Sequence, residues 1–265
     1  MAKKRCYLAG RPVDPCTGSE LKELFQGLVD TKQKRVLANL NLHGLYCSFK
    51  SNTMQHLLLA KDTLVHIDGT PILWLCNLLG AKLNMDYRNA HIDLVPELLK
   101  TCAENNLRVF LVGSNKAGAI ENEAVLRRLV PGLQIKTSPG YFDVDDASGG
   151  TAASRLIDEI NNNNTNLLLV GLGMPKQEEW IAANKDRLNA NMIMPVGGFA
   201  DYFAGRRRIP PRFLGNLGLE WLFRLAEQPL RLGFRYLIEP LLLLALLGLN
   251  TLKGEKWGQE LNANR

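Results

Sequence analysis

The sequence lacks the cysteine patterns that are typical of secreted and zinc-binding proteins. Its five cysteines are scattered and odd in number, and no two of them form a CxxC pair, so the sequence indicates neither a disulfide framework nor a zinc site. The basic N-terminal residues are not followed by an apolar stretch, and we therefore expect no secretory signal. These absences favour a reducing, cytoplasmic environment.

Long apolar runs are also scarce. The most apolar stretch, Leu241–Leu249, is separated by Glu239-Pro240 from Leu237 and Ile238. Because a helix needs roughly 20 apolar residues to cross a bilayer, the sequence predicts that this stretch is too short to span a membrane. Two alternatives remain: it lies in the membrane interface, as a leucine-rich helix after several arginines would, or it packs on the core.

Net positive charge is nearly absent outside one region of the chain. The net charge is +6, and residues 205–235 contain seven arginines and two glutamates, which account for +5 of it. A polyanion or an anionic membrane surface is the natural partner of such a patch. A solvated basic face is the alternative.

What is present is an alternation of short apolar runs with longer segments of helical period. This pattern predicts an α/β fold, a Rossmann-like parallel sheet flanked by helices, with ligands at the carboxyl ends of the strands. Strands are expected at Val36–Leu42, Thr63–Ile67, Leu107–Val112, Leu133–Lys136, Asn166–Val170 and Asn191–Val196. Helices are expected at Pro71–Leu79, Ile92–Asn105, Lys116–Leu129, Thr151–Asn162 and Pro175–Leu188.

The alternation ends after Gly205. No further strand is expected, and the helical segments that follow are Leu217–Glu227 and Leu230–Leu249. We therefore divide the chain into a Rossmann-like core, residues 1–204, and an arginine-rich helical appendage with an apolar C-terminal helix, residues 205–265.

The strongest local motif is a strand end that leads into a helix, Gly171-Leu172-Gly173-Met174-Pro175-Lys176. The glycines permit a tight turn, Pro175 suits the first helical position, and free N–H groups there would face an anion. Lys176 opposes the helix dipole, which is reasonable beside a phosphate. The motif lacks the third glycine of GxGxxG and the spacing of a Walker A loop. A plain strand-to-helix turn is the alternative.

Two other strand ends carry candidate residues. Asp68 follows a buried strand, and because the Thr-Pro pair at 70–71 already provides a helix cap, its carboxylate is available as a general base. Asp-Gly is also a common turn dipeptide. Gly197 and Gly198 permit close approach of a ligand to the backbone, and Asp201 is expected to face that opening.

Metal-binding patterns are weak. Asp143 and Asp145 form a DxD that would suit a divalent cation, but they precede a Ser-Gly-Gly turn, which favours a solvated acidic loop. The four histidines show neither metal-ligand spacing nor a nucleophile–base pattern. We expect no metal and no cofactor.

Taken together, these motifs resemble the WecG/TagA/CpsF glycosyltransferase family. The resemblance extends over residues 33–240 and rests on Asp68-Gly69, Gly171-x-Gly173-x-Pro175-Lys176-Gln177-Glu178, Gly197-Gly198 with Asp201 and Ala204-Gly205, Gly218-Leu219-Glu220-Trp221-Leu222-x-Arg224-Leu225, Pro229-x-Arg231-Leu232 and Arg235-Tyr236. It implies a metal-independent, inverting transfer of N-acetylmannosamine, its uronic acid or glucose from a UDP-sugar to a polyprenyl-diphosphate-linked saccharide. Such enzymes serve bacterial synthesis of teichoic acid, enterobacterial common antigen or exopolysaccharide, as peripheral proteins on the inner face of the plasma membrane.

The resemblance also implies roles for single residues. Asp68 matches the catalytic base, and Gln177 matches a positioning residue of the catalytic site. The positions expected to bind substrate are Asn39, Asn41, Arg88, Gly171, Gly173, Lys176, Gly197, Gly198, Asp201, Arg224 and Arg231. The family often has threonine in place of Asn39 and glycine in place of His91, so the donor sugar is not fixed by the resemblance.

Three alternatives differ in what they leave unexplained. A nicotinamide-dependent oxidoreductase would share the fold pattern but requires the missing GxGxxG. A nucleic-acid-binding protein would use the basic patch but would leave Asp68 and the glycine turns without a role. A pseudoenzyme that acts as a membrane scaffold is disfavoured by the intact Asp68 and Gln177.

Overall fold

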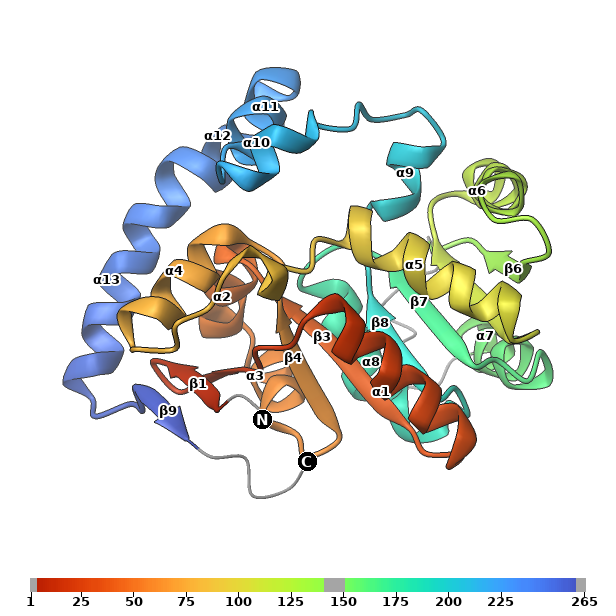
Figure 1. Ribbon diagram of the computed structural model, residues 1–265, viewed down its shortest axis with the longest axis horizontal. Helices are drawn as coiled ribbons and strands as arrows, with labels where there is room; N and C mark the ends of the chain where they lie inside the picture. Colours follow the sequence, from red (N-terminus) through yellow and green to blue (C-terminus); the bar gives the residue numbers. More distant parts are fainter. Residues whose placement is uncertain (1–3, 141–150, 261–265) are drawn as a thin grey trace.

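The centre of the structure is a six-stranded sheet (Figure 1). The computed structural model describes residues 4–140 and 151–260. The strand order is β4-β3-β8-β7-β5-β6, and all neighbours are parallel. Each strand lies within two residues of its predicted bounds, so the α/β prediction is confirmed. The strands are β3 (Arg35–Leu40), β4 (Thr63–Ile67), β5 (Arg108–Gly113), β6 (Gln134–Ser138), β7 (Leu167–Gly171) and β8 (Met192–Pro195).

Helices cover both faces of this sheet. Apolar side chains of α1, α5, α6 and α9 pack on one face around Leu37 and Leu111, and those of α2, α3, α4, α7 and α8 pack on the other around Ala38 and Leu168. Successive strand residues are therefore both buried, as expected for a parallel sheet between two helical layers. The helices are α1 (Gly18–Asp30), α2 (Leu42–Lys50), α3 (Asn52–Leu59), α4 (Thr70–Leu78), α5 (His91–Glu104), α6 (Lys116–Leu129), α7 (Thr151–Asn162), α8 (Lys176–Asn184) and α9 (Phe199–Phe203), with short turns η1 (Met85–Tyr87) and η3 (Lys185–Arg187).

Two details at the helix starts differ from the predictions. Gly69, not Thr70, is the N-cap of α4 and no side chain caps that helix, although Asp68 is indeed not its cap. Pro175 is the N-cap of α8, which begins one residue later than predicted, at Lys176.

A second, small antiparallel sheet joins the two ends of the described chain, in the order β2-β1-β9. The prediction that no strand follows Gly205 was therefore wrong. β9 has the sequence Gly-Gln-Glu, without apolar alternation, and it is held by backbone pairing to β1. Its strands are β1 (Arg5–Leu8), β2 (Arg11–Val13) and β9 (Gly258–Glu260).

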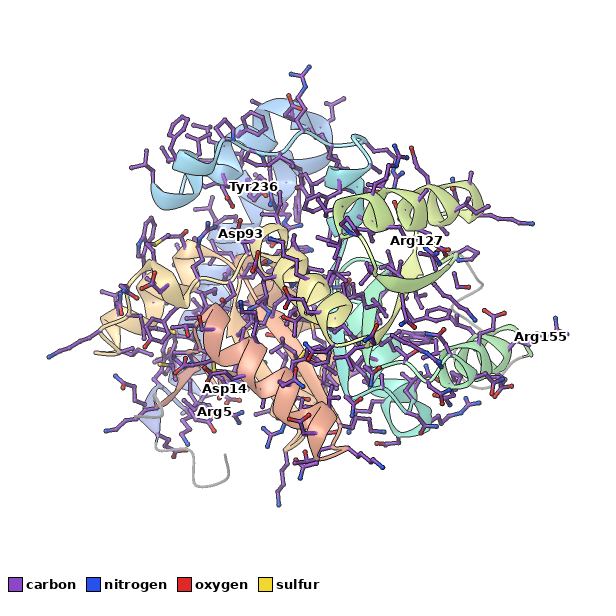
Figure 2. The ribbon with its side chains drawn as sticks, turned by 45° about the vertical axis from the view of Figure 1, so that its right-hand side comes forward. Arg5, Asp14, Asp93, Arg127, Arg155 and Tyr236 are labelled. Atoms are coloured by element: carbon purple, nitrogen blue, oxygen red, sulfur yellow. The ribbon has the colours of Figure 1, made fainter. Side chains whose placement is uncertain are left out.

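A buried carboxylate attaches this small sheet to the core. The Arg5 guanidinium and the Asp14 carboxylate are 2.8 Å apart, and Figure 2 shows the two residues side by side. Asp14 also accepts a hydrogen bond from the Val65 N–H at 2.9 Å. The N-terminal segment is thus fastened to β4 through a fully buried, charge-assisted hydrogen bond.

The appendage arches over the core and then descends beside it (Figure 1). The predicted segment Leu217–Glu227 is present as α11, and a short helix, α10, precedes it. The helices of the appendage are α10 (Arg212–Asn216), α11 (Glu220–Glu227), α12 (Pro229–Gly233), the π-helical η4 (Phe234–Ile238) and α13 (Glu239–Leu252).

The last three of these segments form one continuous helix, Pro229–Leu252, of 24 residues. The predicted helical segment Leu230–Leu249 is therefore confirmed, whereas the prediction that the apolar stretch is too short to span a membrane was wrong as far as the length of the helix is concerned. Pro240 lacks an N–H, and the π turn before it lets the Glu239 N–H reach the Phe234 carbonyl, so the helix continues past the proline. By length and composition alone this helix could cross a membrane, and only 17% of its most apolar window is buried.

Candidate active site

The carboxyl ends of four adjacent strands bring the candidate residues together. In the sheet, β4, β3, β8 and β7 are neighbours, and Leu40 pairs with Ile67. Asn41 and Asp68, the next residues, therefore lie side by side. On the other two strands, Val170 pairs with Pro195, which places the two glycine turns next to each other. This is the edge at which an open α/β sheet binds its ligands.

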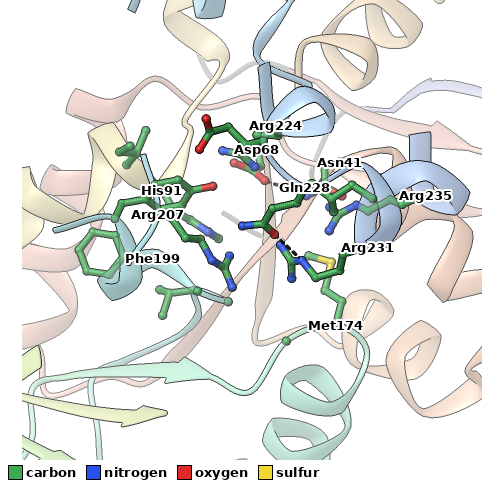
Figure 3. A pocket seen from close by; sticks show the side chains of 18 of the residues that line it. Asn41, Asp68, His91, Met174, Phe199, Arg207, Arg224, Gln228, Arg231 and Arg235 are labelled. Atoms are coloured by element: carbon green, nitrogen blue, oxygen red, sulfur yellow. Dashed lines mark hydrogen bonds between the residues drawn. The ribbon is translucent and has the colours of Figure 1, made fainter. Parts of the chain in front are cut away.

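A cavity of about 220 Å³ lies between this edge and the appendage, and we call it the arginine cavity (Figure 3). Nine of the thirteen predicted site residues line it. They are Asn39, Asn41, Asp68, Gly173, Gln177, Gly197, Gly198, Arg224 and Arg231.

Asp68 is held by two asparagine amides. The Nδ2 groups of Asn41 and Asn39 donate to its Oδ2 at 2.8 and 3.3 Å. Burial alone would raise the pKa of Asp68, but His91, the Asn41 hydrogen bond and Arg224 outweigh it, so that the pKa lies below its ordinary value. Asp68 is therefore an ionised hydrogen-bond acceptor at neutral pH, in the state that a general base requires.

Asn41 has a second task. Its Oδ1 accepts the Gly44 N–H at 2.9 Å, which makes Asn41 the N-cap of α2. The amide cannot rotate without losing the cap, so its Nδ2 is fixed toward Asp68.

Gln177 joins the two glycine turns. Its Oε1 accepts hydrogen bonds from the Gly173 N–H at 3.2 Å and the Gly197 N–H at 2.9 Å, an arrangement we call the Gln177 bridge. The expectation that the N–H groups of the Gly171–Pro175 turn are free for an anion is thus wrong for Gly173. Positive φ angles of 80° and 54° at these glycines explain why larger residues are disfavoured there.

The cationic side of the cavity comes from the appendage. Arg207, Arg224, Arg231 and Arg235 all line it, and Figure 3 shows their side chains around the cavity together with Asp68 and Met174. The pKa of Arg231 is lowered first by burial and then by repulsion from Arg207 and Arg235. Guanidinium groups that repel one another in a shared cavity favour an anion between them.

Asp201 lies just outside the cavity, contrary to the expectation that it faces the opening. Its carboxylate is 3.0 Å from Arg206 and 3.0 Å from Arg207. Arg207 in turn lies against Gly198, where an added Cβ would come within 2.6 Å of its Nη1. Asp201 and Gly198 therefore position Arg207.

A second cavity, of about 300 Å³, adjoins the first. It contains Arg88, which forms an ion pair with Glu220 of α11 at 3.1 Å. Leu42, Pro71, Trp221 and Pro240 give it a more apolar lining. The two cavities share the residues Asn41, Asp68, Arg224, Arg235 and Tyr236.

Two further predicted residues do not line either cavity. Lys176 is exposed at the start of α8, and its proposed phosphate contact stays a prediction. Gly171 permits the close approach of the two turns, because a Cβ there would come within 2.7 Å of the Gly197 carbonyl oxygen.

Sequence reasoning missed several residues that line the arginine cavity. Arg207 was part of the basic patch but was not separated from it. Arg235 and Tyr236 were part of a family motif but were not assigned to the site, and Tyr202 gave no signal on its own. His91 was noted as a departure from the family pattern, and it lies in the cavity near Asp68.

Metal sites remain without support in the described residues. No group of three His, Cys, Asp or Glu side chains within 4–140 and 151–260 is arranged to hold a metal ion. Asp143 and Asp145 lie outside the described residues.

Comparison with known proteins agrees with this geometry. The model of the glycosyl transferase WecG/TagA/CpsF family matches residues 6–256. The chain is similar to N-acetylglucosaminyldiphosphoundecaprenol N-acetyl-beta-D-mannosaminyltransferases of Staphylococcus aureus strains MW2 and NCTC 8325 / PS 47, with 27% identity over 176 residues in each case. The match spans 66% of this chain and 66% of each relative. Because the family model covers nearly the whole chain, the protein belongs to the WecG/TagA/CpsF family of glycosyltransferases.

Proposed function

We propose that the protein transfers a hexose or N-acetylhexosamine from a UDP-sugar to a polyprenyl-diphosphate-linked saccharide, with inversion at the anomeric carbon. The observation that carries this proposal is the position of Asp68 in the wall common to two cavities. One cavity has the charge for a diphosphate, and the other has the size and lining for a saccharide.

The arginine cavity is the proposed donor site. A departing UDP carries about two negative charges on its phosphates, and Arg207, Arg231 and Arg235 would stabilise them as the bond breaks. Binding of that anion would also relieve the mutual repulsion that lowers the pKa of Arg231. The diphosphate thus needs no contribution from a metal in this arrangement.

The second cavity is the proposed acceptor site. Trp221 and Tyr236 supply aromatic surface, with ring centroids 6.0 Å apart, and Arg88 supplies hydrogen-bond donors. The Staphylococcus aureus relatives are named for an N-acetylglucosaminyl-diphosphoundecaprenol acceptor, and we extend that acceptor class to this chain.

The proposed reaction is a single displacement. The Asp68 carboxylate accepts the proton of an acceptor hydroxyl while that oxygen bonds to the anomeric carbon, and the bond from this carbon to the UDP oxygen breaks with its electron pair on the diphosphate. Attack on the face opposite UDP inverts the configuration. One carboxylate suffices because the diphosphate leaves without protonation, unlike the leaving group of glycoside hydrolysis.

We further propose that the protein lies on the cytoplasmic face of the membrane without crossing it. The exposed leucines of α13 suit the interface between headgroups and acyl chains. The Glu239 carboxylate, at the start of α13, is 2.9 Å from the His43 Nδ1 of α2, and Leu243 is buried against the core. These contacts with the core support an orientation of the helix along the molecule over one that crosses the bilayer.

The function is tested with a panel of UDP-sugars and the purified protein. We expect slow hydrolysis of one UDP-sugar by the wild type, and Asp68→Asn to bind UDP as tightly as the wild type while turnover falls by roughly 100-fold or more. Asp30→Asn, an exposed aspartate outside both cavities, is the matched control and should keep full turnover. Normal turnover by the Asp68 variant would remove this residue from the mechanism.

A further inference from the structure

The Gln177 bridge depends on a carboxyl group that the proposed reaction does not use. The Nε2 group of Gln177 donates to Oε1 of Glu178 at 2.8 Å, while its Oε1 accepts from the two glycine turns. The side chain of Gln177 therefore makes three hydrogen bonds, two on the oxygen and one on the nitrogen.

These contacts fix which way the Gln177 amide faces. The Gly173 and Gly197 N–H groups are both donors, so only the amide oxygen can satisfy them. The amide nitrogen must then face Glu178, where an acceptor is required. If that acceptor were missing, a buried N–H would lose its partner, and a rotated amide would turn its nitrogen toward two other donors.

Glu178 itself is in an unusual position for a carboxyl group. Its side chain is 1% exposed, and its Oε2 has no hydrogen-bond partner among the described residues. Burial raises the pKa of Glu178 to about 8, so it is a neutral acid at pH 7. An apolar side chain of similar size would avoid the cost of burying a carboxyl there. The contact that a carboxyl adds is the one to Gln177.

We infer that Glu178 is a positioning residue: through the Gln177 amide it holds the Gly173 and Gly197 turns in the shape that receives the donor nucleotide. This inference rests on the proposed function for the identity of the ligand. It does not place Glu178 in contact with the substrate, and it assigns to Glu178 an effect on donor binding and not on proton transfer.

Two substitutions separate the hydrogen-bond acceptor from the volume of the side chain. Glu178→Leu removes the acceptor, and Glu178→Gln keeps a carbonyl oxygen for the Gln177 nitrogen. Glu179→Gln is the matched control, since it makes the same change one residue later in α8, where the carboxylate accepts from Ser51 Oγ and lines neither cavity.

The measurements are the Kd of UDP by calorimetry, kcat and KM for the UDP-sugar that the wild type hydrolyses, and amide hydrogen exchange at Gly173 and Gly197. For Glu178→Leu we expect the Kd and KM to rise about tenfold, with a smaller change in kcat, and the two glycine amides to exchange at least about tenfold faster. Glu178→Gln should restore all three values to within about threefold of the wild type, and Glu179→Gln should not change them.

Unchanged glycine exchange and UDP affinity in Glu178→Leu would overturn the inference. A loss in Glu178→Gln as large as in Glu178→Leu would do the same, because it would show that the negative charge or the acid, and not the acceptor, matters. If Glu178→Leu does not fold, Glu178→Met is measured by the same criteria. Failure of the wild type to bind UDP would refute the proposed donor, whereas the exchange rates would still decide the role of Glu178.

Discussion

At the scale of single residues, the site contains two carboxyl groups that differ in protonation at neutral pH: one is an ionised carboxylate and the other a neutral acid. Asp68 accepts hydrogen bonds from two amides, and although burial raises its pKa, His91, the Asn41 hydrogen bond and Arg224 together lower it below the ordinary value. Glu178 accepts a hydrogen bond from the Gln177 amide while it is almost fully buried, and burial raises its pKa to about 8. The two groups thus have different tasks on the same sheet edge, since only the ionised one can accept a proton at neutral pH.

The raised pKa of Glu178 predicts a specific dependence of stability on pH. The ordinary pKa is 4.5, so between about pH 4.5 and 8 the folded protein holds a proton that the unfolded chain has released. The free energy of unfolding should therefore fall as pH rises through this window, by up to about 1.4 kcal/mol per unit, and level off above it. Burial is the main cause, and the nearby Glu179 adds to it.

The measurement is urea unfolding of the wild type and Glu178→Gln at pH values from 5 to 9. The unfolding free energy of the wild type should fall by a few kcal/mol relative to that of Glu178→Gln as pH rises. Cys47 of α2, another titratable group near Glu178, has a pKa that burial raises to about 12, and it stays neutral throughout. Glu179→Gln should keep most of the wild-type slope, because burial and not Glu179 is the main cause of the raised pKa. Parallel curves for the wild type and Glu178→Gln would contradict this account.

At the scale of elements, the helices of the appendage contribute both to the arginine cavity and to the exposed apolar surface. Arg224 of α11 and Arg231 of α12 point into the arginine cavity. Along α13, by contrast, Leu241, Leu244 and Leu252 are 65%, 66% and 85% exposed. Helices α11 and α12 thus contribute to the site, while α13 presents several exposed leucines, and large exposed apolar surfaces are typical of membrane or protein contacts.

This exposed face predicts the effect of a charge on α13. Leu244→Glu should reduce sedimentation with vesicles of phosphatidylethanolamine and about one third phosphatidylglycerol by roughly tenfold, because it removes one inserted leucine and adds repulsion from anionic lipid. Ile120→Glu is the control, since Ile120 of α6 is also 66% exposed but lies outside the appendage. Equal sedimentation of the two variants, with unchanged circular dichroism, would show that α13 is not the membrane contact.

The same scale shows what sequence patterns can and cannot predict. Most central strands were predictable because they are mainly apolar and are followed by a turn that contains Gly, Asn or Asp. The order of these strands in the sheet then brings Asn41, Asp68 and the glycine turns together. Helix α1 was missed although Thr17 and Glu20 form a capping box, a signal that is readable in the sequence. The helix through Pro240 was predicted as the segment Leu230–Leu249, but the π turn that precedes the proline was not.

Contacts between distant segments were the least predictable part of the site. Nothing in the spacing of Gln177 indicates that its amide reaches Gly197, 20 residues later, and nothing near Asp201 indicates a pair with Arg207 instead of substrate. These contacts arise when separate strand ends and the appendage meet. Most of the residues predicted from the sequence therefore line the cavity, but the sequence did not indicate which of them touch each other.

At the scale of the whole molecule, the appendage is tied to the core at both ends of α13. Glu239 contacts His43 at one end, and at the other the Lys256 carbonyl accepts the Gly10 N–H at 2.8 Å before β9 pairs with β1. Trp257 and Leu247 also pack against the core cluster of α2, α3 and α4. Residues 1–204 were predicted as a separate core, but in the fold their first strand shares a sheet with residues from the chain's other end.

Two truncations distinguish these contributions. A chain that ends at Leu252 loses β9 but keeps every residue of both cavities, and its Tm should fall by several degrees while vesicle binding and turnover persist. A chain that ends at Ala204 should retain the circular dichroism of an α/β core at a lower Tm, and should lose vesicle binding and most turnover, because Arg207, Arg224, Arg231 and the leucines of α13 are gone. Sedimentation of this shorter chain with anionic vesicles would move the membrane contact to the core. The same Tm for the wild type and the chain ending at Leu252 would show instead that β9 does not contribute to stability. The contacts of Glu239 and the packing of α13 would then suffice to hold the appendage over the site.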